Sequence, residues 1–208
     1  MSVNVSNYQT IHAKLLAQHV SLIAVSKTKP NTDLMELYAL GQRAFGENYV
    51  QELVDKAASL PHDIQWHFIG HLQSNKVKYI APFVHLIHGV DSEKLLQEIN
   101  KQAAKQGRII DCLLQIHIAE EATKFGFDEE SLKELLASNR LANYPNVQVK
   151  GLMGMASFSD DTHQVQQEFK QLKKCFDLAK NKIGVSCSIL SMGMSGDYEL
   201  AIQEGVIW

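Results

Sequence analysis

Short apolar runs alternate with amphipathic stretches from Ser21 to the end of the chain. Most of these runs are continuous rather than alternating, as expected for strands of a parallel sheet that is covered on both faces. They predict strands at residues 22–26, 43–46, 65–70, 84–90, 109–118, 147–153 and 186–192.

The stretches between these strands have the periodicity of helices, and several follow a capping residue such as Ser92 or Asp128. They predict helices at about residues 31–40, 49–59, 75–80, 92–106, 129–139, 162–181 and 195–203. A further helix, at about residues 7–18, precedes the first strand, and its apolar stripe suits it to close the bottom of a barrel.

Seven strand–helix units, followed by residues 205–208 as the beginning of an eighth strand, predict an α/β fold. The unit count favours a (βα)8 barrel of the TIM type with an extra N-terminal helix and a truncated eighth strand. An open, doubly wound sheet gives a similar rhythm and is the alternative. No linker rich in Pro or Gly divides the chain, so residues 1–208 are expected to form a single domain.

Composition and charge exclude several classes of function. Twenty Lys and Arg against 23 Asp and Glu give a formal net charge of −3, and no basic cluster suits nucleic acid. The three cysteines lack CxxC spacing, which argues against a disulfide framework or a zinc site. No apolar run approaches membrane-spanning length, and the first residues lack a signal-peptide pattern. We therefore expect a soluble cytoplasmic protein without a nucleic-acid or membrane partner.

Lys27 occurs at the carboxyl end of the first predicted strand, where the active sites of barrels are built. Strand alternation places Ile23, Val25 and Lys27 on one face, so Lys27 is expected to extend a line of core residues and to be desolvated. Desolvation disfavours the charged amine and prepares it to attack an aldehyde, as in Schiff-base lysines. A solvated lysine at a strand end is the common alternative.

Residues 189–199 pass from a strand through a glycine turn into a helix, where free backbone N–H groups can hold an anion. Late in a barrel this is the usual place for a phosphate site. Gly193 and Gly196 permit close backbone approach, and Ser195 can donate its hydroxyl to a phosphate oxygen. An ordinary helix cap is the competing interpretation.

Other strand ends carry small or polar residues. Residues 150–156 are rich in glycine and leave room for a flat ligand, although tight strand packing explains them equally well. Glu47 and Asn48 lie where a strand passes into a helix, and they offer polar groups to the ring substituents of a ligand. Asn48 as a helix cap is the competing interpretation. His67 and His71 lack acidic or cysteine residues at a matching spacing, so we expect core or hydrogen-bonded histidines rather than metal ligands.

Taken together, these segments resemble the pyridoxal phosphate homeostasis protein family, whose members look like the barrel domain of alanine racemase standing alone. The resemblance spans about residues 21–203. It is carried by Val-Ser-Lys-Thr-Lys-Pro at 25–30, Phe-Gly-Glu-Asn-Tyr at 45–49, Trp-His-Phe-Ile-Gly-His-Leu-Gln-Ser-Asn-Lys at 66–76, Gly-Leu-Met-Gly-Met at 151–155 and Leu-Ser-Met-Gly-Met-Ser at 190–195.

The resemblance implies that Lys27 holds pyridoxal 5′-phosphate as a Schiff base. It also implies that Ser195, with the backbone of Gly193 and Met194, forms part of a phosphate cradle. Further residues expected at the cofactor are Asn48, His71, Met153 and Ser191.

Members of this family bind the cofactor, are not known to turn over an amino acid, and are linked to the balance of B6 vitamers and amino-acid pools. The resemblance therefore implies a carrier or regulator without catalytic residues. Because no catalytic partner domain accompanies the lysine, we hypothesise that Lys27 binds the cofactor reversibly and passes it to apo-enzymes, and we expect a monomer. One departure concerns the end of the family pattern, a Gly- and Ser/Thr-rich strand with Arg-Ile-Gly, where this chain reads Glu-Gly-Val-Ile-Trp at 204–208. We expect this departure to weaken phosphate binding and barrel closure.

Alternative functions belong to different classes. An amino-acid racemase or decarboxylase uses the same lysine and cofactor, but it needs a second domain and a second acid–base group for which the chain has no residues left. An aldolase-like barrel would attack a phosphosugar carbonyl with Lys27 directly. A ligand-free interaction scaffold would keep the fold and lose the cofactor.

Overall fold

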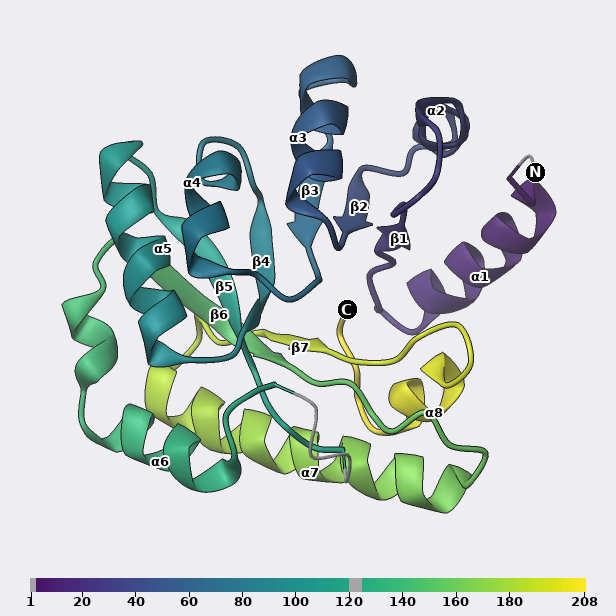
Figure 1. Cartoon of the computed structure of the whole chain (residues 1–208). Coiled ribbons are helices and arrows are strands. Elements are labelled where there is room, and N and C mark those ends of the chain that lie inside the picture. The colour runs from purple at the N-terminus through teal and green to yellow at the C-terminus, as the bar shows by residue number, and fades with distance from the viewer. Residues whose placement is uncertain (1–2, 120–124) are drawn as a thin grey trace.

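The computed structural model describes residues 3–119 and 125–208. Within these residues, seven strands form one parallel sheet in the order β1-β2-β3-β4-β5-β6-β7, and the sheet curls into a partial barrel of the TIM type (Figure 1). The strands are β1 (Ala24–Val25), β2 (Ala44–Glu47), β3 (Gln65–Phe68), β4 (Leu86–Val90), β5 (Ile110–Gln115), β6 (Val147–Met153) and β7 (Ile189–Ser191).

Helices connect successive strands and cover the outside of the curled sheet (Figure 1). They are α1 (Val5–Ala17), α2 (Asn31–Ala39), α3 (Val50–Ser59), α4 (Val77–Ile80), α5 (Glu93–Lys105), α6 (Glu129–Ala137), α7 (Thr162–Ile183) and α8 (Tyr198–Gln203), with 3-10 turns η1 (Ser74–Lys76) and η2 (Arg140–Asn143). The predicted caps are confirmed, because the Ser92 and Asp128 side chains accept hydrogen bonds from the first turns of α5 and α6.

The predicted strands and helices are confirmed in number and order over the described residues, and β6 has the predicted bounds. The sequential strand order excludes a doubly wound sheet, whose strand order reverses at a switch point. β1 is shorter than predicted because it is an edge strand that pairs with β2 alone in the described sheet.

Residues 206–208 lie between the two edges of the sheet. The Ile207 and Trp208 N–H groups donate to the Leu190 carbonyl at 3.0 and 3.1 Å. On the other side, Ser21 N–H donates to the Ile207 carbonyl at 3.0 Å. The chain therefore runs beside β7 and the segment before β1, where the eighth strand was predicted to begin.

The apolar core has an outer and an inner part. The outer part packs the sheet against the helices, and its largest fully buried side chains include Phe45, Phe68 and Phe169. The inner part lies on the concave face of the sheet and consists of Leu86, Leu113, Met153 and Ile189, with Trp208 packed against them.

Helix α1 packs at the open side of the sheet. It buries Leu15, its Tyr8 hydroxyl donates to Gln42 Oε1 at 3.0 Å just before β2, and Lys14 pairs with Glu199 of α8. Among the described residues, no helix is both long and apolar enough to cross a membrane.

Candidate functional site

Lys27 is the second residue after β1, at the carboxyl end of the sheet, as predicted. Its predicted desolvation is wrong, because Lys27 is exposed and Val25, on the same face, is 53% exposed. The reason is the edge position of β1, which leaves this part of the concave face uncovered. The Lys27 amine is therefore accessible to solvent and to a ligand.

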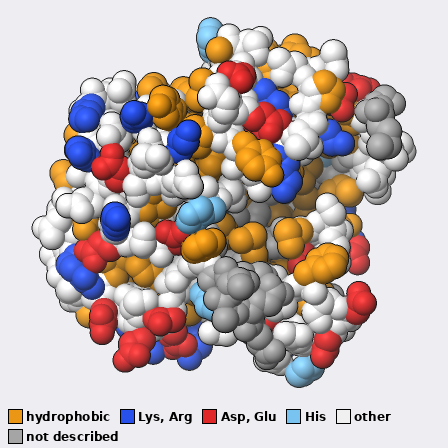
Figure 2. All heavy atoms as spheres, in the orientation of Figure 1, with side chains coloured by type: hydrophobic (Ala, Val, Ile, Leu, Met, Phe, Trp, Pro, Cys, Tyr) orange, Lys and Arg blue, Asp and Glu red, His pale blue; other side chains and the backbone are white. Residues whose placement is uncertain are grey.

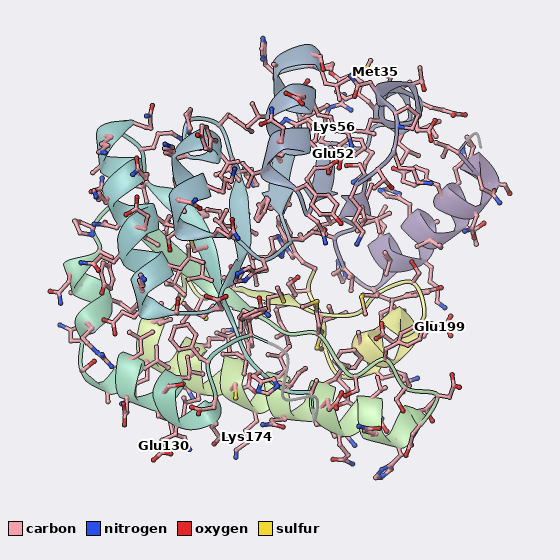
Figure 3. All side chains as sticks on the ribbon, in the orientation of Figure 1. Met35, Glu52, Lys56, Glu130, Lys174 and Glu199 are labelled. Atoms are coloured by element: carbon pink, nitrogen blue, oxygen red, sulfur yellow. The ribbon has the colours of Figure 1, made fainter. Side chains whose placement is uncertain are left out.

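A buried ion-pair network binds the backbone next to Lys27. Lys56 of α3, which is 5% exposed, donates to Glu47 Oε1 and Glu52 Oε1, each at 2.7 Å. Its Nζ also donates to the Ser26 carbonyl at 2.7 Å. Figure 3 shows Glu52 and Lys56 together on the side of α3 that faces β2.

The same network holds the backbone on the other side of Lys27. Thr28 N–H donates to Glu52 Oε1 at 2.6 Å, and Thr28 has a positive φ of 63°. A left-handed conformation is unusual for a β-branched residue and persists only where its surroundings impose it. Lys56 and Glu52 thus fix the peptide groups that flank Lys27. This role was not predicted, although the i,i+4 spacing of Glu52 and Lys56 is visible in the sequence.

Asn48 follows β2 and is not the cap of α3, because the cap position is Tyr49. Its side-chain oxygen Oδ1 is buried and has no hydrogen-bond partner among the described residues. The backbone of Asn48 approaches Gly70 so closely that a Cβ atom on Gly70 would lie 2.5 Å from the Asn48 carbonyl oxygen. A free acceptor of this kind suits a ligand with a hydrogen-bond donor.

His71 follows β3, and its side chain contacts residues from the loops that follow β4 and β5. Its Nδ1 lies 3.1 Å from Asp91 Oδ2. Its ring stacks on Phe125, with ring centroids 4.3 Å apart and an angle of 22° between the planes. His71 therefore stands at the rim of the site with its polar and aromatic partners engaged.

The turn after β7 contains the predicted phosphate ligands. Gly193 has φ 89°, and a Cβ atom there would lie 2.8 Å from the Cβ of Ala201, so the turn requires glycine. Ser195 is exposed. Met194 N–H donates to Asp197 Oδ1 at 2.5 Å, so a bound phosphate would compete with this carboxylate for the Met194 amide.

Helix α8 begins at Tyr198, three residues later than predicted, because residues 194–197 form a turn. Asp197 N–H and Tyr198 N–H both donate to the Met194 carbonyl, at 3.1 and 2.9 Å. Residue 195 therefore lies in the turn rather than in the helix.

The predicted site residues form two groups at the carboxyl end of the sheet. Lys27, Asn48 and His71 follow β1 to β3, whereas Met153 and Ser191 are register partners at the ends of β6 and β7, before the turn with Gly193, Met194 and Ser195. Residues 206–208 lie between β7 and the segment before β1. Figure 2 shows apolar side chains gathered around a hollow near the middle of the face it presents.

Two buried histidines connect this site to the interior. His67 Nδ1 lies 2.9 Å from His88 Nε2, and His88 Nδ1 lies 3.1 Å from Ser191 Oγ. His67 is thus a hydrogen-bonded core histidine, as expected. The contact of His88 with Ser191 was not predicted, because β4 and β7 are distant in the sheet order and only the curl of the sheet brings them together. Over the two described ranges, no three His, Cys, Asp or Glu side chains gather as a metal site.

The chain is similar to known proteins over nearly its whole length. The family model for the N-terminal domain of alanine racemase matches residues 5–206. A pyridoxal phosphate homeostasis protein of Aquifex aeolicus is 40% identical over 185 residues, which cover 88% of this chain and 80% of that protein. One of Schizosaccharomyces pombe is 38% identical over 191 residues, which cover 90% of this chain and 79% of that protein.

Solved structures have the same fold. PipY of Synechococcus elongatus with PLP bound is 36% identical and superposes with a TM-score of 0.83, covering 94% of this chain and 93% of that chain. The same protein without PLP gives a TM-score of 0.86 at 37% identity, with the same coverage. Alanine racemase from Bartonella henselae shares the fold at 16% identity, with a TM-score of 0.68 over 95% of this chain and 54% of that chain.

Proposed function

This chain belongs to the pyridoxal phosphate homeostasis proteins, within the alanine racemase N-terminal domain family, and on this premise we propose that it binds pyridoxal 5′-phosphate on Lys27 and acts in vitamin B6 homeostasis. The observation that carries the proposal is the accessible Lys27 amine, whose flanking peptide groups are fixed by a buried ion-pair network. The PLP-bound PipY structure supports it, since that protein shares the fold at 36% identity.

The described residues fit this cofactor. Lys27 offers a reachable amine for an aldehyde, and the unpartnered Asn48 Oδ1, which follows the neighbouring strand β2, offers an acceptor. The Gly193 turn and the exposed Ser195 hydroxyl support a phosphate site, because a turn before a helix can offer free N–H groups to an anion. When bound, the cofactor supplies an electrophilic carbon for the lysine and a phosphate that anchors it.

We assign each predicted residue a role toward the cofactor. Lys27 would form the covalent attachment, and Asn48, His71 and Met153 would contact the ring. Ser191, Gly193, Met194 and Ser195 would hold the phosphate. This assignment follows from their positions at the carboxyl ends of the strands, where barrels bind ligands.

We further propose a carrier that does not catalyse turnover. Racemisation and decarboxylation require acid–base groups placed beside the reacting carbon. Lys56, the cation that binds the backbone beside Lys27, is itself engaged by Glu47 and Glu52 and is not free for such a role. The exposure of Lys27 also leaves an attached ligand open to water and amines, which suits release to apo-enzymes.

We propose that the chain acts as a single-domain monomer in the cytoplasm. Its Cys112, Cys175 and Cys187 are buried free thiols, and burial raises the pKa of Cys175 and Cys187 to about 11. Thiols that stay protonated and reduced suit a reducing compartment.

The attachment to Lys27 is tested by absorbance. Protein is incubated with pyridoxal 5′-phosphate, freed of excess, and scanned in the near-visible range before and after borohydride reduction. We expect a Schiff-base band that reduction traps on Lys27, no band in Lys27→Ala, and a normal band in the control Lys29→Ala, which removes a neighbouring exposed lysine. An equal band in Lys27→Ala would contradict the assignment.

The carrier function needs a separate measurement. Loaded protein should activate an apo-enzyme faster than the same amount of free cofactor does, while alanine or another amino acid should show no racemisation or loss of CO2. Activation no faster than with free cofactor would refute transfer. Sustained turnover of an amino acid would instead favour the enzyme.

A further inference from the structure

A hydrogen-bonded chain of side chains crosses the concave interior from β3 through β4 to β7. It consists of His67, His88 and Ser191, joined by contacts of 2.9 Å between the imidazoles and 3.1 Å from His88 Nδ1 to Ser191 Oγ. His67 is 0% exposed and His88 is 1% exposed. The proposed function explains Ser191 but assigns no role to either histidine.

Both imidazoles are neutral at physiological pH. Burial, with a smaller contribution from the charge of His85, lowers the pKa of His88 to about 3. Burial also lowers the pKa of His67 well below its usual value, and His88 and His85 add to this effect. A neutral imidazole has one N–H donor and one acceptor nitrogen, so the chain has a direction.

The environment of His67 determines this direction. Its Nε2 is buried and has no hydrogen-bond partner among the described residues. If His88 donated to His67, then Nε2 would carry a buried N–H without an acceptor, and the neighbouring Trp208 ring offers only a weak N–H···π contact. Unpaired buried N–H groups are rarer than underused acceptors. The favoured arrangement therefore has His67 Nδ1–H donating to His88 Nε2.

The proton on His88 then lies on Nδ1, which donates to Ser191 Oγ. A serine hydroxyl that accepts a bond from His88 keeps its own O–H for a different acceptor. Ser191 lies at the carboxyl end of β7, two residues before the Gly193 turn. A phosphate group offers only acceptor oxygens once it is ionised, and it is the matching partner.

We propose that His88 is a positioning residue that fixes the Ser191 hydroxyl as a donor to the phosphate of the ligand, with His67 setting the tautomer of His88. This inference rests on the proposed function for the identity of the ligand. It makes the site selective for phosphorylated over unphosphorylated pyridoxal, because the oriented O–H has no partner in the latter.

The direct test does not require a ligand. Nitrogen-15 NMR of labelled histidines in the ligand-free protein distinguishes protonated from unprotonated ring nitrogens. We expect His88 to be protonated at Nδ1 and His67 at Nδ1. An unprotonated His88 Nδ1 would overturn the proposal even if Lys27 binds the cofactor normally.

The binding test uses paired substitutions. The amide of asparagine mimics imidazole Nδ1, so His88→Asn retains a donor toward Ser191, whereas the amide of glutamine mimics Nε2, so His88→Gln loses it. Affinities for pyridoxal 5′-phosphate and for pyridoxal are measured from the near-visible band, and circular dichroism verifies that each variant is folded.

We expect His88→Gln and Ser191→Ala each to weaken binding of the phosphorylated form about tenfold, as for the loss of one charge-assisted hydrogen bond. Both should leave pyridoxal within about twofold, their effects should not add, and His88→Asn should stay near wild type. Additive losses, or an equal loss for pyridoxal, would show a merely structural role. If the wild type forms no band on Lys27, the proposed function itself has failed, and the NMR result still decides the tautomer.

Discussion

Lys27, the proposed attachment residue, is held in place by side chains that the sequence does not mark as functional. The apolar run predicted its position after β1 but did not predict its exposure. Strand alternation shows which side chains share a face, but it does not show whether other parts of the fold cover that face. The residues that fix its backbone, Lys56 and Glu52, lie on α3 and look like an ordinary helical surface pair. Their burial is a property of the packed fold.

Replacing Lys56 with methionine should strongly destabilise the protein. The substitution leaves Glu47, which is 0% exposed, without its cation, and breaking a buried ion pair costs about 3–5 kcal/mol of unfolding free energy. It should also slow attachment of the cofactor to Lys27, because the Ser26 carbonyl loses its donor. Urea unfolding and the rate of band formation measure the two effects.

A matched control for this prediction is Lys133→Met, which removes an exposed i,i+4 pair with Glu129 on α6. Its effect on stability should be a small fraction of that of Lys56→Met, because solvent screens exposed pairs. Adding Glu47→Gln to Lys56→Met should recover part of the lost stability. Equal effects of Lys56→Met and Lys133→Met would contradict the importance assigned to the buried network.

At the level of elements, hydrophobic periodicity predicted the number and order of the strands better than it predicted where each strand ends. β6 has the predicted bounds, whereas the edge strand β1 and the interior strand β5 are both shorter than predicted. α8 starts late because the Asp197 carboxylate closes the preceding turn through Met194 N–H, a local choice that periodicity does not report.

Substituting Asp197 with asparagine should strengthen anion binding at the turn after β7. Asparagine keeps an oxygen acceptor for Met194 N–H but removes a negative charge beside the proposed phosphate site. A charge about 4 Å away in water is worth ~1 kcal/mol, or about fivefold in affinity. Competition of inorganic phosphate with pyridoxal 5′-phosphate measures the change, with Asp160→Asn, an exposed carboxylate before α7, as control. Unchanged or weaker phosphate binding would place the phosphate elsewhere.

For the whole molecule, the curled sheet brings distant strands into contact on its concave face. His88 reaches Ser191 across the interior, and Trp208 packs against the inner apolar residues and beside His67. The repeated βα units predicted the barrel itself, since each unit is a local pattern. These interior contacts could not be predicted because they depend on how far the sheet curls.

The buried histidines predict that stability falls on mild acidification. The unfolded chain protonates His88 below about pH 6.5, whereas the native state, with a pKa of about 3, does not, so the unfolded state binds more protons between these values. At 1.36 kcal/mol per pH unit, His88 should account for the loss of roughly 2 kcal/mol between pH 6.5 and pH 5. His67, whose pKa is lowered by the same burial, acts in the same direction.

Urea unfolding at pH 7, 6 and 5 measures this effect in a range where carboxylates with lowered pKa values, such as Asp63 and Glu129, remain ionised. The His88→Asn variant removes the titrating group and should flatten the dependence, while the control His62→Asn removes an exposed histidine and should leave it steep. A dependence as steep in His88→Asn as in the wild type would assign the loss of stability to other groups. It would also remove the premise that this imidazole stays neutral and keeps its proton on the nitrogen that faces Ser191.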